Sequence, residues 1–317
     1  MSLIPTHDLI AKLRSRGAHS VALQFPAGLK RQAWPVAAAL RDAGFAVIVS
    51  GDPCYGACDL DLDALDLADV LVHFGHAPVE ERARVIYERA AADIDVSVLE
   101  KALPLLSKKR IGLITTVQHV HQIDAMAAFL ESRGIEGVAA PGDGRSPLRG
   151  QVLGCNFSAA RATGAEEFLY VGTGLFHPIG VQLATGARVV ALDPYTGTAQ
   201  EVDASRLIRR RFAVMEKARD AESVGIIVST KSGQQRLDLA RRLAALSDRA
   251  VLVTMREVCP DELLNLGFAC YVNTACPRLA YDDQVRFPVP VLSPEEFEIL
   301  CGVRRFEDYA IDEYLCP

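Results

Sequence analysis

Short apolar runs alternate with longer stretches of amphipathic pattern along most of the chain. The apolar runs predict strands, several of them closed by a polar or glycine-rich loop, at residues 20–25, 46–51, 66–78, 110–116, 137–142, 166–180, 187–197, 223–234, 249–255 and 268–279. The intervening stretches predict helices at 7–16, 31–44, 118–134, 235–246 and 261–267, and glycine follows several of them as a helix stop. The pattern therefore predicts regular alternation of strand and helix.

Near-continuous apolar strands that alternate with helices are typical of parallel sheets buried on both faces. The alternation begins again near Lys109 and once more near Ser223. We therefore predict an α/β protein of three similar domains, each a small parallel sheet flanked by helices. The expected domains cover residues 1–103, 104–215 and 216–317, with boundaries uncertain by several residues.

Composition and charge argue against a nucleic-acid-binding, membrane-spanning or secreted protein. A net charge of −6 and a pI near 5.7 provide no electrostatic footprint for nucleic acid. The apolar runs are too short for a membrane span, and the first residues lack the pattern of a signal peptide, so a cytosolic location is expected. The eight cysteines are then better interpreted as thiols or metal ligands than as disulfides.

Three cysteines stand in loops that follow predicted strands: Cys58, Cys155 and Cys276. Ligands bind at the carboxyl ends of strands in such folds, and thiolates are the usual ligands of iron–sulfur clusters. Three thiolates on a [4Fe–4S] cluster would leave one iron open to a chelating amino acid, such as the methionine part of S-adenosylmethionine. A buried, inert role is the alternative for any of these cysteines, and Cys54 is the closest competitor of Cys58.

The segment STKSGQ joins a strand to a helix at residues 229–234. Backbone N–H groups there could hold a carboxylate, with charge added by Lys231. The candidate cofactor-binding residues are Lys231, Ser232, Gly233 and Gln234, for the amino-acid end or the ribose of S-adenosylmethionine. The alternative is an ordinary turn with a solvated lysine.

The segment GTGLFHPIG offers a second candidate loop at residues 172–180. Gly172 and Gly174 would permit close backbone approach to the adenosine. His177 is the candidate catalytic residue, because it could donate to the substrate or position a target imidazole. Alternatively the glycines serve a tight turn and the histidine is a hydrogen-bonded loop residue.

The remaining histidines and the basic run are expected mainly to form local hydrogen bonds or to face solvent. His73 and His76 stand at a strand end and could be a metal pair, although hydrogen bonding within the loop is the simpler expectation. His119 and His121 are expected on a solvent or interface face, and the basic run 206–212 on a solvated helix face or against a protein substrate.

Two further segments leave alternatives open. The acidic run 59–66 is expected to start a helix, where carboxylates are favoured. Asp59 could instead approach the sulfonium of S-adenosylmethionine. The tail 308–317 is expected either to pack back on the body or to remain mobile.

A set of motifs in fixed order gives the chain a family resemblance. The motifs are GDPCYGACDLD, HFGHAP, GCNFSAAR, GTGLFHPIG, DPYTG, STKSGQ and NTACPRLAYDD. Together they resemble the archaeal 2-(3-amino-3-carboxypropyl)histidine synthases, the first enzymes of diphthamide biosynthesis. The resemblance runs along almost the entire chain.

The resemblance implies a non-standard radical S-adenosylmethionine enzyme, whose three domains surround a central [4Fe–4S] cluster held by Cys58, Cys155 and Cys276. It implies transfer of the 3-amino-3-carboxypropyl group to a histidine of translation elongation factor 2, with methylthioadenosine as the by-product. An external electron donor and a homodimer are expected as partners. The alternatives are an iron–sulfur electron-transfer or partner subunit without its own S-adenosylmethionine chemistry, and a metal-free domain set that binds a small metabolite.

Overall fold

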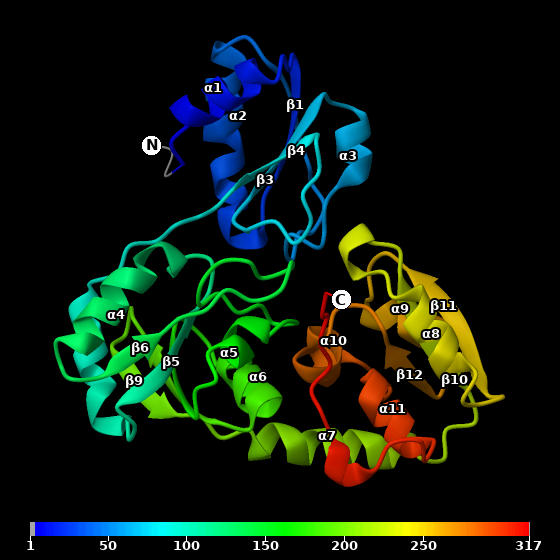
Figure 1. The fold of residues 1–317 in the computed structure, drawn as a ribbon. Helices are drawn as coiled ribbons and strands as arrows, with labels where there is room; N and C mark the ends of the chain where they lie inside the picture. Colours follow the sequence, from blue (N-terminus) through cyan, green and yellow to red (C-terminus); the bar gives the residue numbers. More distant parts are fainter. Residues whose placement is uncertain (1–3, 317) are drawn as a thin grey trace. The chain divides into compact units, whose positions relative to one another are not determined.

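A computed structural model of the chain describes residues 4–316. Its backbone contacts divide it into two compact units, Met1–Asp93 and Ile94–Pro317 (unit 1 and unit 2). Unit 1 carries one sheet and unit 2 carries two, and the predicted class of three parallel-sheet α/β domains is confirmed (Figure 1). Among the described residues, no helix combines the length and the apolar character needed to cross a membrane.

The sheet of unit 1 has four parallel strands in the order β2-β1-β3-β4. Its elements are α1 (His7–Ser15), β1 (Ser20–Gln24), η1 (Ala27–Gln32), α2 (Ala33–Asp42), β2 (Ala46–Val49), α3 (Leu62–Asp66), β3 (Val70–Phe74) and β4 (Val85–Glu88). Successive strand residues point to opposite faces. Leu23 accordingly packs with α1 and α2, while Ala22 packs with α3, so both faces are buried.

The first sheet of unit 2 has the order β6-β5-β7-β8-β9. Its elements are η2 (Val96–Lys101), η3 (Leu103–Leu105), β5 (Arg110–Thr115), η4 (Val120–Gln122), α4 (Ile123–Glu131), β6 (Glu136–Val138), α5 (Ser158–Ala162), β7 (Glu167–Val171), α6 (Phe176–Thr185), β8 (Arg188–Asp193) and β9 (Thr198–Glu201). β9 pairs antiparallel with β8, unlike the other strands of the sheet. Along β7, Phe168 packs on one face and Leu169 on the other, so this sheet too is covered on both sides.

The second sheet of unit 2 has the order β11-β10-β12-β13, all parallel. Its elements are α7 (Ser205–Ala218), β10 (Val224–Ser229), η5 (Ser232–Gln234), α8 (Leu237–Ala244), β11 (Ala250–Met255), α9 (Pro260–Leu266), β12 (Cys270–Asn273), α10 (Arg278–Tyr281), η6 (Asp283–Arg286), β13 (Val291–Leu292), α11 (Pro294–Leu300) and η7 (Phe306–Asp308). All three sheets therefore share the order second, first, third, fourth strand. In this order the second strand lies on one side of the first strand, and the third and fourth lie on the other. The loops at this change of side, between the first and third strands, are suited to bind ligands.

The domain boundaries at 103/104 and 215/216 stay predictions. Ile94, Leu99 and Ala102 pack in the core beneath the first sheet of unit 2. Helix α7 leads from that sheet to the next (Figure 1).

Two expectations about polar groups are wrong. The basic run is not solvated throughout, because Arg211 is buried in an ion pair with Glu296, whereas its neighbours Arg209 and Arg210 are exposed. His119 is also buried, at 2% exposure, so only His121 of that pair faces solvent. For Arg211, a partner distant in sequence, Glu296, supplies what water would otherwise provide.

Candidate functional site

Cys58 lies in unit 1, in the loop between the edge strand β2 and helix α3. It is half-buried, whereas Cys54 in the same loop is buried at 5% exposure. The acidic run does start a helix, as expected: Asp61 caps α3 by accepting a hydrogen bond from the N–H of Ala64. Of the two thiols, that of Cys58 is the more accessible to a ligand.

Cys155 lies in unit 2, in a tight turn that follows β6 and leads into α5. A bridge between Leu153 and Asn156 closes the turn, and the fully buried ring of Phe157 anchors its far side. The Asn156 side chain is fixed as well, because its amide donates to Asp143 at 2.8 Å. The thiol of Cys155 is half-buried on a loop held from both ends.

Cys276 follows β12 and precedes the short helix α10. The Asn273 amide donates a 2.8 Å hydrogen bond to the carbonyl oxygen of Cys276, and the preceding Thr274 and Ala275 are buried. Cys276 is half-buried. It therefore stands, like Cys155, in a fixed loop at the carboxyl end of a strand.

One residue of the C-terminal tail joins these two cysteine loops. The Tyr314 N–H donates to the carbonyl of Cys155 at 2.7 Å, and its carbonyl accepts from the Asn156 amide at 2.7 Å. Its hydroxyl donates to the Gln234 carbonyl at 2.6 Å and lies 3.3 Å from the carbonyl of Ala275. Burial raises the pKa of the Tyr314 phenol, while the nearby charge of Arg236 lowers it and that of Asp312 raises it. Tyr314 therefore contacts the backbone of both cysteine loops.

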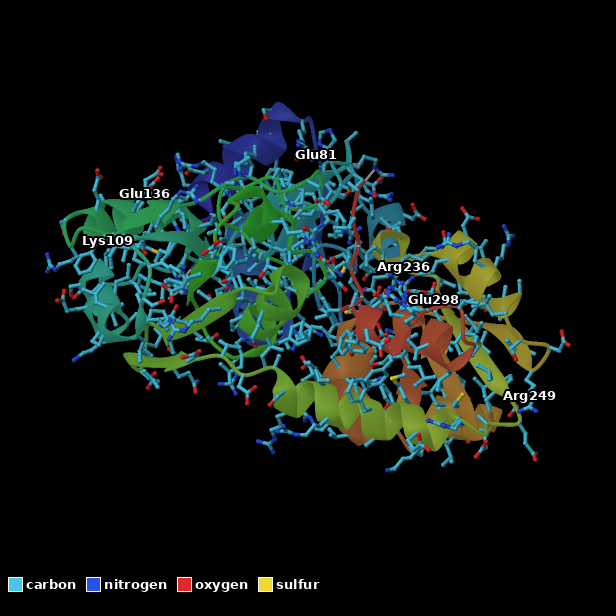
Figure 2. All side chains as sticks on the ribbon, turned by 60° about the horizontal axis from the view of Figure 1, so that its bottom comes forward. Glu81, Lys109, Glu136, Arg236, Arg249 and Glu298 are labelled. Atoms are coloured by element: carbon cyan, nitrogen blue, oxygen red, sulfur yellow. The ribbon has the colours of Figure 1, made fainter. Side chains whose placement is uncertain are left out.

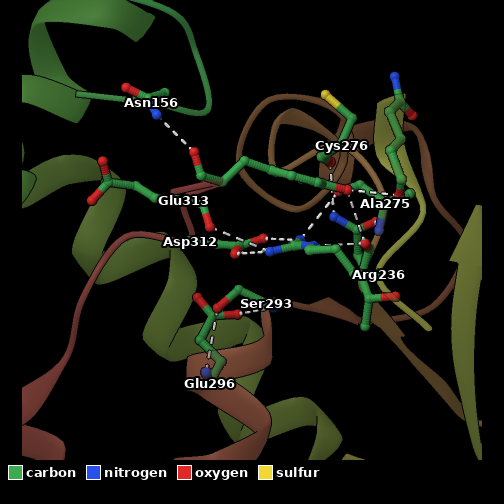
Figure 3. Close-up of polar contacts among 12 residues, drawn as sticks. Asn156, Arg236, Ala275, Cys276, Ser293, Glu296, Asp312 and Glu313 are labelled. Atoms are coloured by element: carbon green, nitrogen blue, oxygen red, sulfur yellow. Dashed lines mark hydrogen bonds and ion pairs between the residues drawn. The ribbon is translucent and has the colours of Figure 1, made fainter. Parts of the chain in front are cut away.

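Two guanidinium groups pack against the ring of Tyr314. Arg145 lies 4.6 Å and Arg236 lies 4.1 Å from the ring centroid. Arg236 is held in turn by two 2.6 Å contacts with Asp312 and by a hydrogen bond to the carbonyl of Ala275 (Figure 3). Arg236 lies among packed side chains, whereas Arg249 projects at the edge of the molecule (Figure 2). Two arginines, one of them paired with Asp312, therefore lie beside the tyrosine that joins the two cysteine loops.

The segment GTGLFHPIG differs in part from the expected loop. Gly172 and Gly174 do lie in a loop, and Gly174 has φ +72°. His177, however, lies in the first turn of α6, its ring stacked on Tyr170 with centroids 6.1 Å apart. Desolvation and the nearby charge of Arg278 lower the pKa of His177 to about 4, so the imidazole is neutral at pH 7.

The first turn of α6 meets both cysteine loops. The Arg278 guanidinium, two residues after Cys276, lies 4.9 Å from the ring centroid of Phe176. A Cβ atom at Gly154 would come within 2.7 Å of the same ring, so only glycine fits beside Cys155. Phe176, the neighbour of His177, therefore lies against both loops.

The segment STKSGQ is also close to the tail, but it is not a helix start. A short 3₁₀ turn covers Ser232–Gln234, and α8 begins only at Leu237. Lys231 is not solvated: its exposure is 6%, and its Nζ lies 2.5 Å from Glu257 Oε1. Arg145 donates to the carbonyl of Gly233 at 3.1 Å. The segment is therefore fixed beside Tyr314 by backbone contacts.

Unit 2 thus brings together two of the three predicted cluster ligands, Cys155 and Cys276, with the segments of His177 and Lys231. Cys58 belongs to the other unit, and its convergence with them stays a prediction. Half-exposed thiols in fixed loops suit a cluster that takes cysteine ligands, so the residues present fit such a group. The assignments to S-adenosylmethionine also stay predictions.

Sequence reasoning left open whether the tail packs or remains mobile, gave it no role at the site, and did not single out the arginines around it. The tail does pack back on unit 2, through Asp312, Glu313 and Tyr314. One signal was available: large apolar residues such as Ile311 and Tyr314 are interspersed with acidic ones in this segment. Arg145 and Arg236 had no local signal, since their partners lie far away in sequence.

His73 and His76 are hydrogen-bonded to each other, as expected from the sequence. His73 Nε2 lies 2.9 Å from His76 Nδ1. Burial lowers the pKa of His73 to about 3 and that of His76 to about 4. Both rings are neutral at pH 7.

Comparison with known proteins places the chain in a family. Residues 25–311 match the model of the family described as "Putative diphthamide synthesis protein". The 2-(3-amino-3-carboxypropyl)histidine synthase of Pyrococcus horikoshii is 40% identical over 98% of this chain and 94% of its own length. Subunit 1 of the human enzyme of that name is 32% identical over 96% of this chain and 73% of its own.

A solved structure is similar over nearly the whole chain. The crystal structure of Dph2 from Pyrococcus horikoshii with a 4Fe-4S cluster superposes with a TM-score of 0.92, at 37% identity, covering 98% of this chain and 93% of that one. Fold, motifs and sequence therefore agree, and the chain belongs to the diphthamide synthesis protein family.

Proposed function

We propose that this protein is a 2-(3-amino-3-carboxypropyl)histidine synthase that uses a [4Fe–4S] cluster bound by Cys58, Cys155 and Cys276. The observation that carries the proposal is the contact set of Tyr314, which holds the Cys155 and Cys276 loops side by side with the segment STKSGQ. Two cysteine loops far apart in sequence are thus held together through one tyrosine. A cluster that takes one thiolate from each loop would require this arrangement.

The reaction takes the 3-amino-3-carboxypropyl group from S-adenosylmethionine. When bound, the cluster supplies the electron that cleaves the bond between the sulfonium and the γ-carbon of methionine, which leaves methylthioadenosine. The freed group adds to carbon 2 of a histidine of elongation factor 2. Loss of one electron, which the oxidised cluster could accept, and of the proton on carbon 2 would restore the aromatic ring. An external donor provides the initial electron.

The residues of this chain bind and orient the reactants. Gly172 and Gly174 leave room for the adenosine to approach the backbone, and Gly174 has the positive φ that glycine tolerates. The turn of Ser232, Gly233 and Gln234 offers backbone groups to the amino-acid end, and Lys231 adds positive charge that Glu257 holds in place. Neutral His177 has one N–H donor and one lone pair with which to position the target imidazole.

A homodimer is part of the proposal. Strand β11 is an edge strand of its sheet and leaves Val251 and Leu252 exposed. Exposed apolar edge strands are open to pairing with another chain. This edge is one surface that a second copy could cover.

The test is anaerobic reconstitution followed by reaction with S-adenosylmethionine, dithionite and elongation factor 2. We expect methylthioadenosine and a mass increase on one histidine of the factor. Deoxyadenosine as the main product would overturn the proposed bond cleavage. A cluster whose visible spectrum does not respond to S-adenosylmethionine would instead favour an electron-transfer or partner subunit.

A further inference from the structure

Unit 1 contains a second group of side chains that could bind a metal, and none of them is one of the three cysteines predicted to hold the iron–sulfur cluster. It consists of Cys54, His73 and His76, whose ligand atoms all lie within 4.8 Å of one another. Cys54 is 5% exposed and His73 is fully buried. Sulfur and imidazole nitrogen form the donor set that zinc prefers.

The fold brings the two histidines together through one glycine. His73 is the next-to-last residue of β3, and Gly75, directly after the strand, has φ +93°. A side chain at Gly75 would be strained, and its Cβ would come within 2.9 Å of Pro26 Cγ. The reversal at Gly75 allows the ring of His76 to return toward His73, with centroids 5.1 Å apart.

The neighbouring amide of Gln24 fixes which nitrogen of His73 carries the proton. Gln24 Nε2 donates to the carbonyl of Asp59 at 2.7 Å, and Gln24 Oε1 accepts from the N–H of Asp61 at 3.3 Å. Oε1 is therefore the atom that faces His73 Nδ1 at 2.8 Å. Since Oε1 can only accept, Nδ1 carries the proton and His73 Nε2 presents its lone pair.

That lone pair points at His76 Nδ1, 2.9 Å away. In the metal-free protein, a proton on His76 Nδ1 forms the hydrogen bond to His73 Nε2. A metal ion can replace this proton, after which His76 carries its hydrogen on Nε2. Metal-bound histidines commonly have their second nitrogen fixed by a hydrogen bond to an oxygen, as Gln24 does here for His73.

We propose that Cys54 Sγ, His73 Nε2 and His76 Nδ1 form a zinc site that is separate from the iron–sulfur site. Binding releases the thiol proton of Cys54, while each imidazole keeps one proton, on Nδ1 of His73 and on Nε2 of His76. Three protein ligands leave a fourth position for water. The site also explains why two cysteines stand four residues apart in one loop: Cys54 turns inward to the histidines, while Cys58 remains half-exposed.

Cobalt provides a spectroscopic test, because Co²⁺ substitutes for Zn²⁺ and its thiolate complexes absorb in the near ultraviolet. The titration uses full-length protein in which Cys58, Cys155 and Cys276 are all replaced by serine, so that the predicted cluster ligands cannot contribute. We expect one Co²⁺ per chain with a thiolate charge-transfer band, displaced by Zn²⁺. Adding Cys54→Ser should remove the band, and adding His76→Gln should weaken binding at least about tenfold.

The control is Cys270→Ser in the same background, since Cys270 is an equally buried cysteine in the other unit. Absence of the band, or its survival after Cys54→Ser, would overturn the zinc site. If Cys54→Ser fails to fold, X-ray absorption of the zinc-loaded background protein decides instead. One sulfur and two imidazoles support the site, and no sulfur, or more than one, contradicts it.

A crossed comparison separates this inference from the proposed function. With the natural cysteines restored, Cys58→Ser should lose the iron cluster and retain zinc, and Cys54→Ser should do the reverse. In the unsubstituted protein, an intact iron cluster without zinc binding would overturn only the zinc site. Loss of iron binding with intact zinc in the unsubstituted protein would sink only the iron–sulfur proposal.

Discussion

The backbone N–H of Tyr314 donates a 2.7 Å hydrogen bond to the carbonyl oxygen of Cys155. Through its hydroxyl the same tyrosine reaches the backbone just before Cys276, at 3.3 Å from the carbonyl of Ala275. The relative position of the two cysteine loops therefore depends on one residue near the end of the chain. The first prediction concerns this residue.

Replacing Tyr314 with alanine should lower the stability of unit 2 by about 2 kcal/mol, because a hydrogen bond and two cation–ring contacts are lost together. Tyr314→Phe removes only the hydroxyl and should cost about 1 kcal/mol. Urea unfolding of the metal-free protein measures both effects. After reconstitution, the alanine variant should also retain less iron per chain. Equal iron content in the variant and the natural protein would show that Tyr314 does not position the cysteines.

Serine in place of Cys58, Cys155 or Cys276 should each abolish the cluster and reduce transferase activity at least about a hundredfold, since direct ligands matter at least as much as the groups behind them. Iron and sulfide analysis after anaerobic reconstitution is the measurement, with about four irons per chain expected for the natural protein. Cys270→Ser is the matched control, and its iron content should not change. A full cluster in any one of the three variants would remove that residue from the ligand set.

Glu295 should make stability depend on pH. Burial, with the nearby Asp312 as a second cause, raises the pKa of Glu295 from 4.5 to about 8. Its Oε2 is buried and has no hydrogen-bond partner among the described residues. Between these two pKa values the folded protein keeps the proton that the unfolded chain has released, so stability falls as the pH rises toward 8.

Glu295→Gln replaces the protonated acid by a neutral group of the same shape. The variant should therefore lose part of the decline in melting temperature between pH 5 and about 8. Calorimetry across that range gives the comparison, and the exposed Glu307 provides a matched control as Glu307→Gln. Parallel curves for the natural protein and Glu295→Gln would contradict the raised pKa.

The buried pair of Arg211 and Glu296 should be costly to break from one side. Arg211 donates to Glu296 at 2.8 and 2.5 Å, and both side chains are at most 1% exposed. Arg211→Met would leave a buried carboxylate without its partner and should cost about 3–5 kcal/mol. Arg210→Met, one residue away and exposed, should cost little.

A double-mutant cycle completes that prediction. Arg211→Met combined with Glu296→Met should be more stable than either single variant, because no unpaired charge remains. Urea unfolding of the four proteins gives the coupling energy. Additive losses would mean that the two side chains do not depend on each other.

The sequence predicted the parts of this molecule that are encoded locally. Apolar runs such as residues 110–116 predicted most strands of the three sheets, and the loops after those strands held the cysteines. The short strands β4 and β13, of four and two residues, were not predicted. Strand β9 was missed because its segment TAQE is short and mostly exposed. The burial of Arg211 was not predicted, because nothing in the sequence distinguishes it from the two arginines before it. Its partner Glu296 lies 85 residues away.

The site was predictable only as far as loop context and family resemblance reach. Neither could show that Tyr314 joins two cysteine loops, since hydrogen bonds to backbone carbonyls leave no pattern in the sequence. Likewise, the sequence offered no third ligand for His73 and His76. Cys54 becomes their neighbour only when the loops after β2 and β3 are folded beside each other.

The contact between Asn156 and Tyr314 spans 158 residues of chain. Loops of that length close late in folding, because their entropy must be lost before the contact compensates for it. The Cys155 and Cys276 loops are therefore among the last parts of unit 2 to acquire their native spacing. Iron added to a refolding reaction too early would meet separated thiols, so a productive preparation folds the polypeptide first and introduces iron and sulfide afterwards.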